Sequence, residues 1–277
     1  MILGGGTVGT AKLLLSSCEH LRLLSSHIGK NVAFNGSVKA AGLLPDGFIE
    51  GDMLSGRSHP GMISYHFFNS LGLTISSAKP LPLDIISSAH LTIAGEGGTE
   101  AYWGQKHVDL MKLYRRKMIV LYALGLTPSC VEIRQTGVHS FAPHLELGSE
   151  LRNYYTNTKE LLNSILSRNG CTLLNTRFIN SEGKEYEDIH FTTTHMIGSC
   201  RMADRKEDGV VDAYGEVFDY PGLYVADGAA IPTSLAVNSS LTILANAERI
   251  AGHLAKRFYR KGRQNEGIIA KLPRADS

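Results

Sequence analysis

The spacing of apolar residues predicts two long helices, each with one buried face. Residues 150–168 place apolar side chains three or four positions apart, as an amphipathic helix requires. Ser149 is suited to cap this helix, and Asn169-Gly170 is suited to end it. The same spacing predicts the second long helix over residues 239–259. The buried face of the first helix is expected to hold Leu151, Tyr155, Thr158, Leu162 and Ile165.

Shorter helices and strands fill the rest of the chain. Two further helices are predicted, over residues 7–17 and 104–116. Apolar runs bounded by Gly, Pro and Asn predict strands at several places. These strands cover residues 1–3, 31–34, 63–67, 89–94, 118–124, 131–134, 171–178 and 223–226.

Charge and composition narrow the class of protein. The chain has 277 residues and a net charge of +2, too weak a bias to indicate nucleic acid or an anionic membrane surface as a partner. With 43% hydrophobic and 19% charged residues, it has the composition of a folded globular protein. No apolar run reaches the ~18 residues of a membrane span. Gly4 and Lys12 interrupt the apolar start, so no signal peptide is expected, and the default location is the cytoplasm.

The first glycine motif offers several interpretations. Residues 4–9 fit GxGxxG between a strand and a helix, but a dinucleotide site also needs an acidic residue at the end of the next strand. Residues 31–34 are followed by Asn35-Gly36 instead. The missing acid argues against a nicotinamide-dependent Rossmann protein. A second interpretation is a later βα unit of a cofactor domain that touches a ligand through its backbone.

The second half carries more specific motifs. Residues 223–226 form a buried strand that ends in Asp227-Gly228. An acid at that place can bond ligand hydroxyls, and the glycine lets a ligand approach closely. The segment Asn238-Ser239-Ser240 opens the last long helix, where free N–H groups favour negative charge. The string His195-Met196-Ile197-Gly198 precedes both.

Taken in order, these strings resemble the glucose–methanol–choline (GMC) oxidoreductases, flavoenzymes that oxidise alcohols with FAD. The resemblance is nearest to the cholesterol-oxidase-like branch. It is strong over residues 187–258 and recognisable over residues 1–35, while residues 36–186 resemble the substrate domain only loosely. Ala236 and Ser239 stand where the family usually has Gly and Pro.

The resemblance implies two active-site residues and a set of cofactor contacts. His195 matches the active-site histidine, and Asn238 matches the second active-site position. A histidine of ordinary pKa, about 6.5, can accept the hydroxyl proton of an alcohol near neutral pH. An asparagine amide offers both a donor and an acceptor to the same oxygen. The residues implied to contact FAD are Asp227, Gly228, Asn238, Ser240 and Thr242; no metal site is expected.

The resemblance also implies the domain plan and the function. We expect an α/β (α+β) fold, with a partial Rossmann-like FAD domain from residues 1–30 and 196–260. Residues 31–195 are expected to form a substrate domain on a mainly antiparallel sheet, and residues 261–277 a flexible tail. The expected function is oxidation of a small-molecule alcohol, for which a sterol-like compound is one candidate, by hydride transfer to flavin N5.

A rival interpretation concerns the part of the family's FAD domain that lies upstream of the matched motifs. The family's FAD domain begins with its own GxGxxG and an acidic ribose ligand upstream of the motif at residues 4–9. The chain is therefore expected to be the C-terminal part of such an enzyme. The alternative function is a non-catalytic fragment that keeps the fold and binds no FAD.

Overall fold

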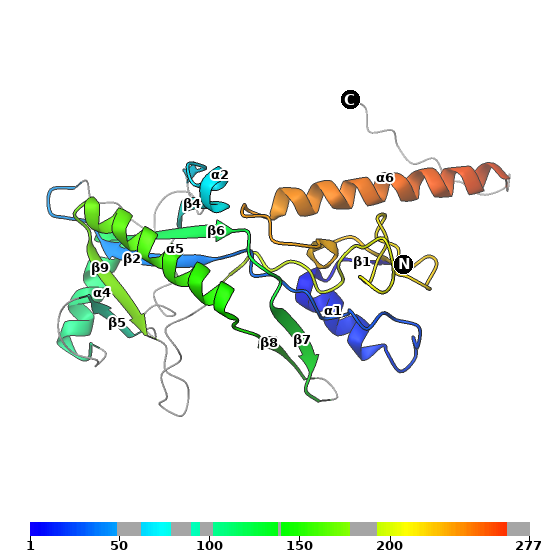
Figure 1. Ribbon diagram of the computed structural model, residues 1–277, viewed down its shortest axis with the longest axis horizontal. Coiled ribbons are helices and arrows are strands. Elements are labelled where there is room, and N and C mark those ends of the chain that lie inside the picture. Colours follow the sequence, from blue (N-terminus) through cyan, green and yellow to red (C-terminus); the bar gives the residue numbers. More distant parts are fainter. Residues whose placement is uncertain (49–61, 79–89, 95–101, 138–139, 178–192, 265–277) are drawn as a thin grey trace.

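The computed structural model describes residues 1–48, 62–78, 90–94, 102–137, 140–177 and 193–264. These residues form an extended body (Figure 1). A large sheet with α4 and α5 lies at one end, and α1 and α6 lie at the other. No helix in the described ranges is long and apolar enough to cross a bilayer.

The sheet has six strands, and every pairing in it is antiparallel. This confirms the mainly antiparallel sheet expected from the sequence. The strand order is β3-β4-β6-β2-β9-β5. In that order the strands are Ile63–Ser64, Leu73–Ala78, Met118–Gly125, Val38–Leu43, Thr172–Arg177 and His90–Ile93.

The two faces of this sheet differ in what covers them. Helix α5 (Ser149–Arg168) packs Leu162 and its neighbours against Val38 and Ala123 on one face. Helix α4 (Gln105–Lys117) covers one end of the opposite face, together with apolar side chains that include Leu43. Side chains alternate between the faces of a strand, so the residues beside Val38 and Ala123 point the other way.

The part of that second face beyond α4 carries polar side chains. Lys39 on β2 lies opposite Tyr122 on β6, and Tyr122 lies opposite Ser76 on β4. Thr74 lies two residues before Ser76 and on the same face of the sheet. This stretch of polar residues becomes the floor of the site described below.

The other end of the molecule is built from segments far apart in sequence. Strand β1 (Ile2–Leu3) pairs in parallel with β10 (Tyr224–Val225), and helix α1 (Gly6–Ser16) follows β1. A short 3₁₀ turn, η1 (Gly228–Ala230), follows β10 and contacts α1. Their shared core includes Leu3, Leu14, Val210, Val225 and Ala229.

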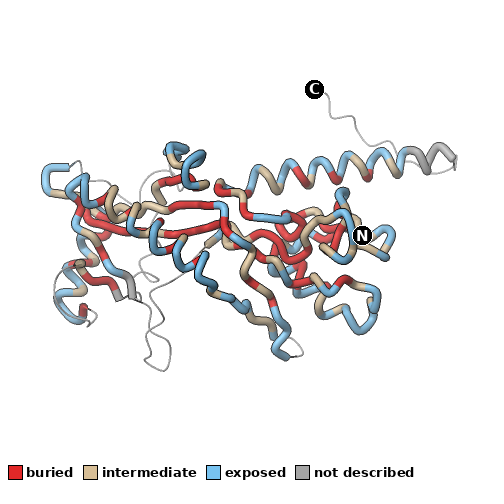
Figure 2. Tube along the Cα trace, viewed as in Figure 1, coloured by how far each residue is buried: buried red, intermediate tan, exposed pale blue. Residues whose placement is uncertain are grey.

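Two helices and a hairpin complete the described structure. Helix α6 (Ser240–Gln264) packs Ile250 and Leu254 against Tyr224 and leaves its other side exposed (Figure 2). A hairpin of β7 (Val131–Gln135) and β8 (Phe141–Leu145) projects below α1 (Figure 1). The short helix α2 (Phe68–Leu71) leads into β4.

The predicted helices lie within a few residues of the observed ones, and three details need correction. Ser149 is the first residue of α5, and Gly148 occupies its N-cap position, so Ser149 does not cap the helix. Leu166, rather than Ile165, completes the buried face. Helix α6 continues through Gln264, into the segment expected to be a tail.

The predicted strand at residues 31–34 is also wrong. These residues make two isolated bridges, Val32 with Val131 and Ala33 with Ile197. The central strand is β2, whose small residues Ala40, Ala41 and Gly42 give a weak strand signal.

Gly36 provides a test of the turn that leads into β2. Its φ is +60°, and a Cβ there would lie 2.5 Å from the carbonyl oxygen of Gly125. We expect Gly36→Ala to lower the free energy of unfolding by about 2–4 kcal/mol, from backbone strain plus a clash with backbone atoms. Gly47→Ala is the control, because its φ is +87° but nothing lies within 4 Å of the added Cβ. Its expected cost is about 1 kcal/mol. Equal losses in denaturant unfolding would show that the close approach at Gly125 is unimportant.

Candidate active site

Asp227 lies at the junction of β10, η1 and α1. One carboxylate oxygen, Oδ2, accepts hydrogen bonds from the Gly6 N–H (2.9 Å) and the Thr10 hydroxyl (2.6 Å). The other, Oδ1, accepts from the Ala229 N–H at 2.8 Å. Asp227 is only 8% exposed, so these partners replace the water that the carboxylate would otherwise bind.

These contacts change the interpretation of the glycine turn. The Gly6 N–H binds Asp227, and the Gly5 N–H donates to the Thr10 hydroxyl at 3.1 Å. A phosphate-binding turn needs such N–H groups to point at the ligand. Both are used inside the protein, which agrees with the sequence argument against a primary ADP-binding turn. A carboxylate has about four acceptor positions, so Asp227 keeps about one for a further donor.

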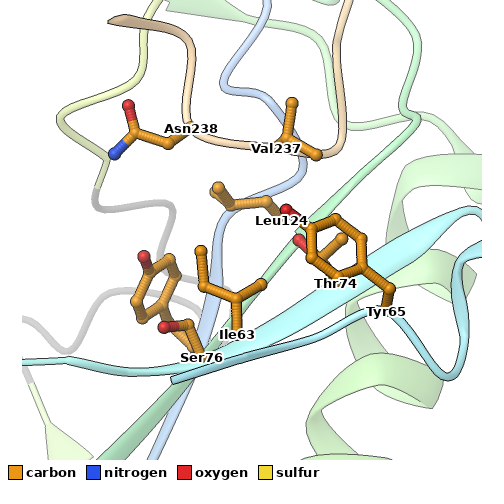
Figure 3. A pocket seen from close by; sticks show the side chains of 8 residues that line it. Ile63, Tyr65, Thr74, Ser76, Leu124, Val237 and Asn238 are labelled. Carbon is orange, nitrogen blue, oxygen red and sulfur yellow. The ribbon is translucent and has the colours of Figure 1, made fainter. Parts of the chain in front are cut away.

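Asn238 lies in the segment that leads into α6. Its Oδ1 accepts the Ser240 N–H at 3.1 Å, which forms a turn just before the helix. The side-chain nitrogen then remains as the donor of the amide. In Figure 3 this nitrogen lies on the side of the sheet strands and the oxygen on the far side. Asn238 is exposed, so a ligand can reach it.

A pocket lies between this segment and the polar part of the sheet (Figure 3). Val237 and Asn238 form one side of it, and side chains of β3, β4 and β6 form the other. The lining mixes hydroxyl groups with aliphatic side chains. It consists of Ile63, Tyr65, Thr74, Ser76, Tyr122, Leu124, Val237 and Asn238.

His195 lies beside the same stretch of sheet. Its ring stacks on Tyr122, with ring centroids 6.4 Å apart and an interplanar angle of 18°. Its backbone N–H donates to the Thr193 hydroxyl at 2.9 Å. Tyr122 also lines the pocket that contains Asn238. One tyrosine is therefore shared by the two residues that the sequence nominates as catalytic.

The pKa of His195 lies below its ordinary value. Partial burial is the larger cause, because it disfavours the charged imidazolium. The positive charge of Lys39 on β2 lowers the pKa further. The ring is thus held in its neutral form, which can accept a proton.

The remaining nominated residues lie around the start of α6. Gly228 is buried, and a Cβ there would lie 3.2 Å from Thr7 Oγ1 and from Ile243 Cδ1. Its missing side chain thus lets α1 and α6 approach η1. Ser240 is exposed and Thr242 half-buried, both on the first turn of α6. Within the described ranges, no cluster of His, Cys, Asp or Glu could hold a metal ion.

Sequence reasoning missed Tyr122, Ser76 and Thr74, which form the floor of the pocket. Their signal was present only in the alternation of β4 and β6, which places polar residues on one face. Sequence reasoning also missed the structural role of Asn35, which stands next to Gly36 at a turn.

The fold and the pocket together define the class of protein. It is an α/β protein in two parts, with a pocket where its antiparallel sheet meets the start of α6. Comparison with known proteins gives a family match over part of the chain. Residues 151–247 match the model of the GMC oxidoreductase family. The chain carries a GMC oxidoreductase C-terminal domain, which confirms the resemblance seen in its motifs. Members of this family bind FAD and act on CH–OH donors.

Individual relatives support the family over short segments. The chain is 52% identical to a cholesterol oxidase of Mycobacterium tuberculosis over 59 residues, which are 21% of this chain and 10% of that protein. It is 39% identical to a 2-methyl-1,2-propanediol dehydrogenase of Mycolicibacterium austroafricanum over 64 residues, 23% of this chain and 12% of that protein.

A solved structure supports the fold. Formate oxidase of Aspergillus oryzae superimposes with a TM-score of 0.58 at 14% sequence identity, over 91% of this chain. The match covers 53% of that chain, so this chain spans about half the length of the enzyme.

The environment of His195 gives a prediction that needs no substrate. The pKa of His195, followed by NMR of its ring protons, should lie below 6.5. In Lys39→Gln it should rise toward 6.5 but stay below it, because burial remains. Lys112→Gln, on the exposed side of α4, is the control and should leave the titration unchanged. An identical midpoint in the Lys39 variant would contradict the electrostatic effect.

Proposed function

We propose that the protein is an FAD-dependent oxidoreductase that oxidises the CH–OH group of a small-molecule alcohol in the pocket between the sheet and α6. The observation that carries the proposal is the place of Tyr122. This tyrosine stacks on His195 and lines the pocket of Asn238, so both polar side chains border one stretch of sheet.

His195 is the proton acceptor in this proposal. Removing a hydride from the carbon of an alcohol requires that the hydroxyl proton leave as well. Burial and Lys39 lower the pKa of His195, so a ring nitrogen is free to take that proton near neutral pH. The ring lies nearly parallel to that of Tyr122, the tyrosine that also lines the pocket.

Asn238 is the hydrogen-bond donor to the substrate oxygen. Its Oδ1 already accepts the Ser240 N–H, and the Nδ2 group offers the N–H donors that a substrate oxygen needs. An N–H donor stabilises the oxygen as negative charge develops on it during proton loss. The two residues then act on the same oxygen from different sides.

FAD, when bound, supplies the flavin N5 atom that accepts the hydride. The backbone of Asp227, Gly228 and Asn238 and the side chains of Ser240 and Thr242 are the groups that would hold it. The first turn of α6 suits the flavin end, because the start of a 25-residue helix carries partial positive charge. Asn238 and Ser240 are exposed there.

The pocket indicates the kind of alcohol. Ile63, Leu124 and Val237 offer apolar contacts, while the hydroxyl groups of Thr74, Ser76 and Tyr122 lie among them. The pocket encloses only about the space of one water molecule, so it suits the hydroxyl end of an alcohol whose apolar framework lies outside it. A sterol-like secondary alcohol is one compound of this class.

Substitution of His195 tests the catalytic role. With FAD at saturating concentration, His195→Gln should slow flavin reduction by alcohol about 10²- to 10⁴-fold, the usual loss when a general base is removed. His253→Gln is the matched control, because His253 also stacks on a tyrosine, Tyr214, at 3.9 Å but on α6. Stopped-flow absorbance at the flavin band measures both. Reduction at the wild-type rate in His195→Gln would exclude the proposed role.

A second candidate is a fragment that keeps the fold without holding FAD. The observation in its favour is that Asp227 and the Gly5 and Gly6 N–H groups already have hydrogen-bond partners within the chain. They offer little to the adenosine and pyrophosphate of the cofactor, whose binding depends on several such hydrogen bonds.

Titration with FAD separates the two candidates. If the chain is the proposed oxidoreductase, it should bind FAD saturably with a Kd of about 10 μM to 1 mM, because only the flavin end finds partners, whereas the fragment should show no saturable binding. Isothermal titration calorimetry and the absorbance of the purified protein report this directly. A yellow protein with one tightly bound FAD per chain would contradict the prediction and remove the second candidate.

A further inference from the structure

The segment that presents Asn238 has an unusual backbone. Ala236 has a φ of +57°, in the left-handed region that favours glycine. Ala236 is nevertheless fully buried, and Asn238, two residues further along, is exposed and lines the pocket. A strained conformation of this kind persists only where surrounding contacts hold it.

Asn35 supplies most of those contacts. Its Oδ1 accepts the N–H groups of Leu235 (2.7 Å) and Ala236 (3.0 Å). Its Nδ2 donates to the carbonyl oxygen of Val237 at 2.7 Å. The Thr74 hydroxyl donates to the carbonyl oxygen of Ala236, also at 2.7 Å. Two side chains therefore bind four backbone groups in the three residues before Asn238.

Asn35 is itself fixed to the sheet. It is fully buried with a φ of +56°, and its backbone carbonyl accepts the Gly125 N–H at 3.1 Å. The Tyr154 hydroxyl donates to the carbonyl oxygen of the next residue, Gly36, at 2.6 Å. Gly125 is the last residue of β6, the strand that carries Tyr122. Asn35 thus connects the strand beneath His195 with the segment that ends in Asn238.

We propose that Asn35 is a positioning residue of this site: its amide holds residues 235–237 so that Asn238 meets the substrate oxygen in register with His195. The assignment rests on the proposed function for its catalytic consequence. The structural part of the assignment rests only on hydrogen bonds within this chain. The structural part and the catalytic consequence are therefore tested separately.

The chemistry of the contacts explains why an amide is needed. The three hydrogen bonds require an acceptor and a donor in one short planar group, and a primary amide provides both. A carboxylate at position 35 keeps the acceptors but places an oxygen against the Val237 carbonyl, where the donor stood. Asn35→Asp therefore removes one contact and makes it repulsive, with almost no change in side-chain volume.

The Ser240 N–H reports where Asn238 is, without any substrate. It is bonded to Asn238 Oδ1 and lies on an exposed residue, so displacement of Asn238 exposes it to water. In Asn35→Asp, hydrogen exchange of the Ser240 amide should accelerate about fivefold or more, as for loss of one hydrogen bond. Exchange at Leu121 and Ala123, in β6, should stay as in the wild type and show that the fold is retained.

Two further variants complete the structural test. Asn169→Asp is the matched control, because the Asn169 amide also donates to a backbone carbonyl, that of Ile165 at 2.8 Å, at the far end of α5. It should leave Ser240 exchange unchanged. Thr74→Val removes one hydroxyl donor to the same segment and should accelerate exchange less than Asn35→Asp does. If Asn35→Asp fails to fold, Asn35→Gln, which keeps the amide but moves it one methylene further from the backbone, takes its place in the exchange test. Unchanged Ser240 exchange in the variant that folds would overturn the proposal.

Kinetics test the catalytic consequence. Asn35→Asp should lower the rate of flavin reduction about 10- to 100-fold, with the pH dependence set by His195 unchanged. In the Asn238→Ala background it should have no further effect, because Asn35 acts through Asn238. Additive losses would mean that Asn35 acts elsewhere. A wild-type protein that reduces no flavin would overturn the proposed function, while the exchange result would still decide whether Asn35 positions Asn238.

Discussion

The structure depends on a single buried carboxylate. Asp227 binds Gly6 and Thr10, which lie 221 and 217 residues away in the sequence, and also the nearby Ala229. Hydrogen bonds to a charged acceptor are stronger than those between neutral groups, and low exposure strengthens them further. They fix β1 and α1 against β10 and η1, and so fix the direction in which the chain leaves towards α6. They add to the pairing of β1 with β10 and to the shared apolar core in ordering the first segment of the chain against the last.

The site arises because a second set of contacts joins this end of the molecule to the sheet. Asn35, Thr74 and Thr127 bind residues 234–237 from the sheet side; Thr127 does so through the Ser234 hydroxyl at 3.1 Å. The pocket therefore has one wall from each part of the protein, and neither part forms it alone. Tyr122 and Asn238 line one pocket only because both parts are held in one arrangement.

The sequence predicts this fold best where periodicity is strong. Helices α4, α5 and α6 follow from apolar spacing, since each buries one face. Strand β2 was not predicted, because a central strand rich in Ala and Gly has no alternation of apolar and polar residues to detect. The motifs identified His195 and Asn238 as candidate residues, but they did not predict the side chains that form the floor of the pocket. Which face of β4 and β6 is covered depends on how far α4 extends, and no local pattern contains that information.

Asn238 shows that a structural and a functional role can be one arrangement. As the turn residue before α6, it must direct Oδ1 to the Ser240 N–H, since that orphan N–H would otherwise lack a partner inside the helix. This requirement orients the planar amide, so its nitrogen becomes the group available to a ligand. Free in solution, an amide could offer either end to an alcohol. Here the start of the helix selects the donor, which is the end that stabilises an oxygen losing its proton. The contacts of Asn35 hold the backbone just before Asn238, so they fix the position of the Asn238 amide as the helix start fixes its orientation.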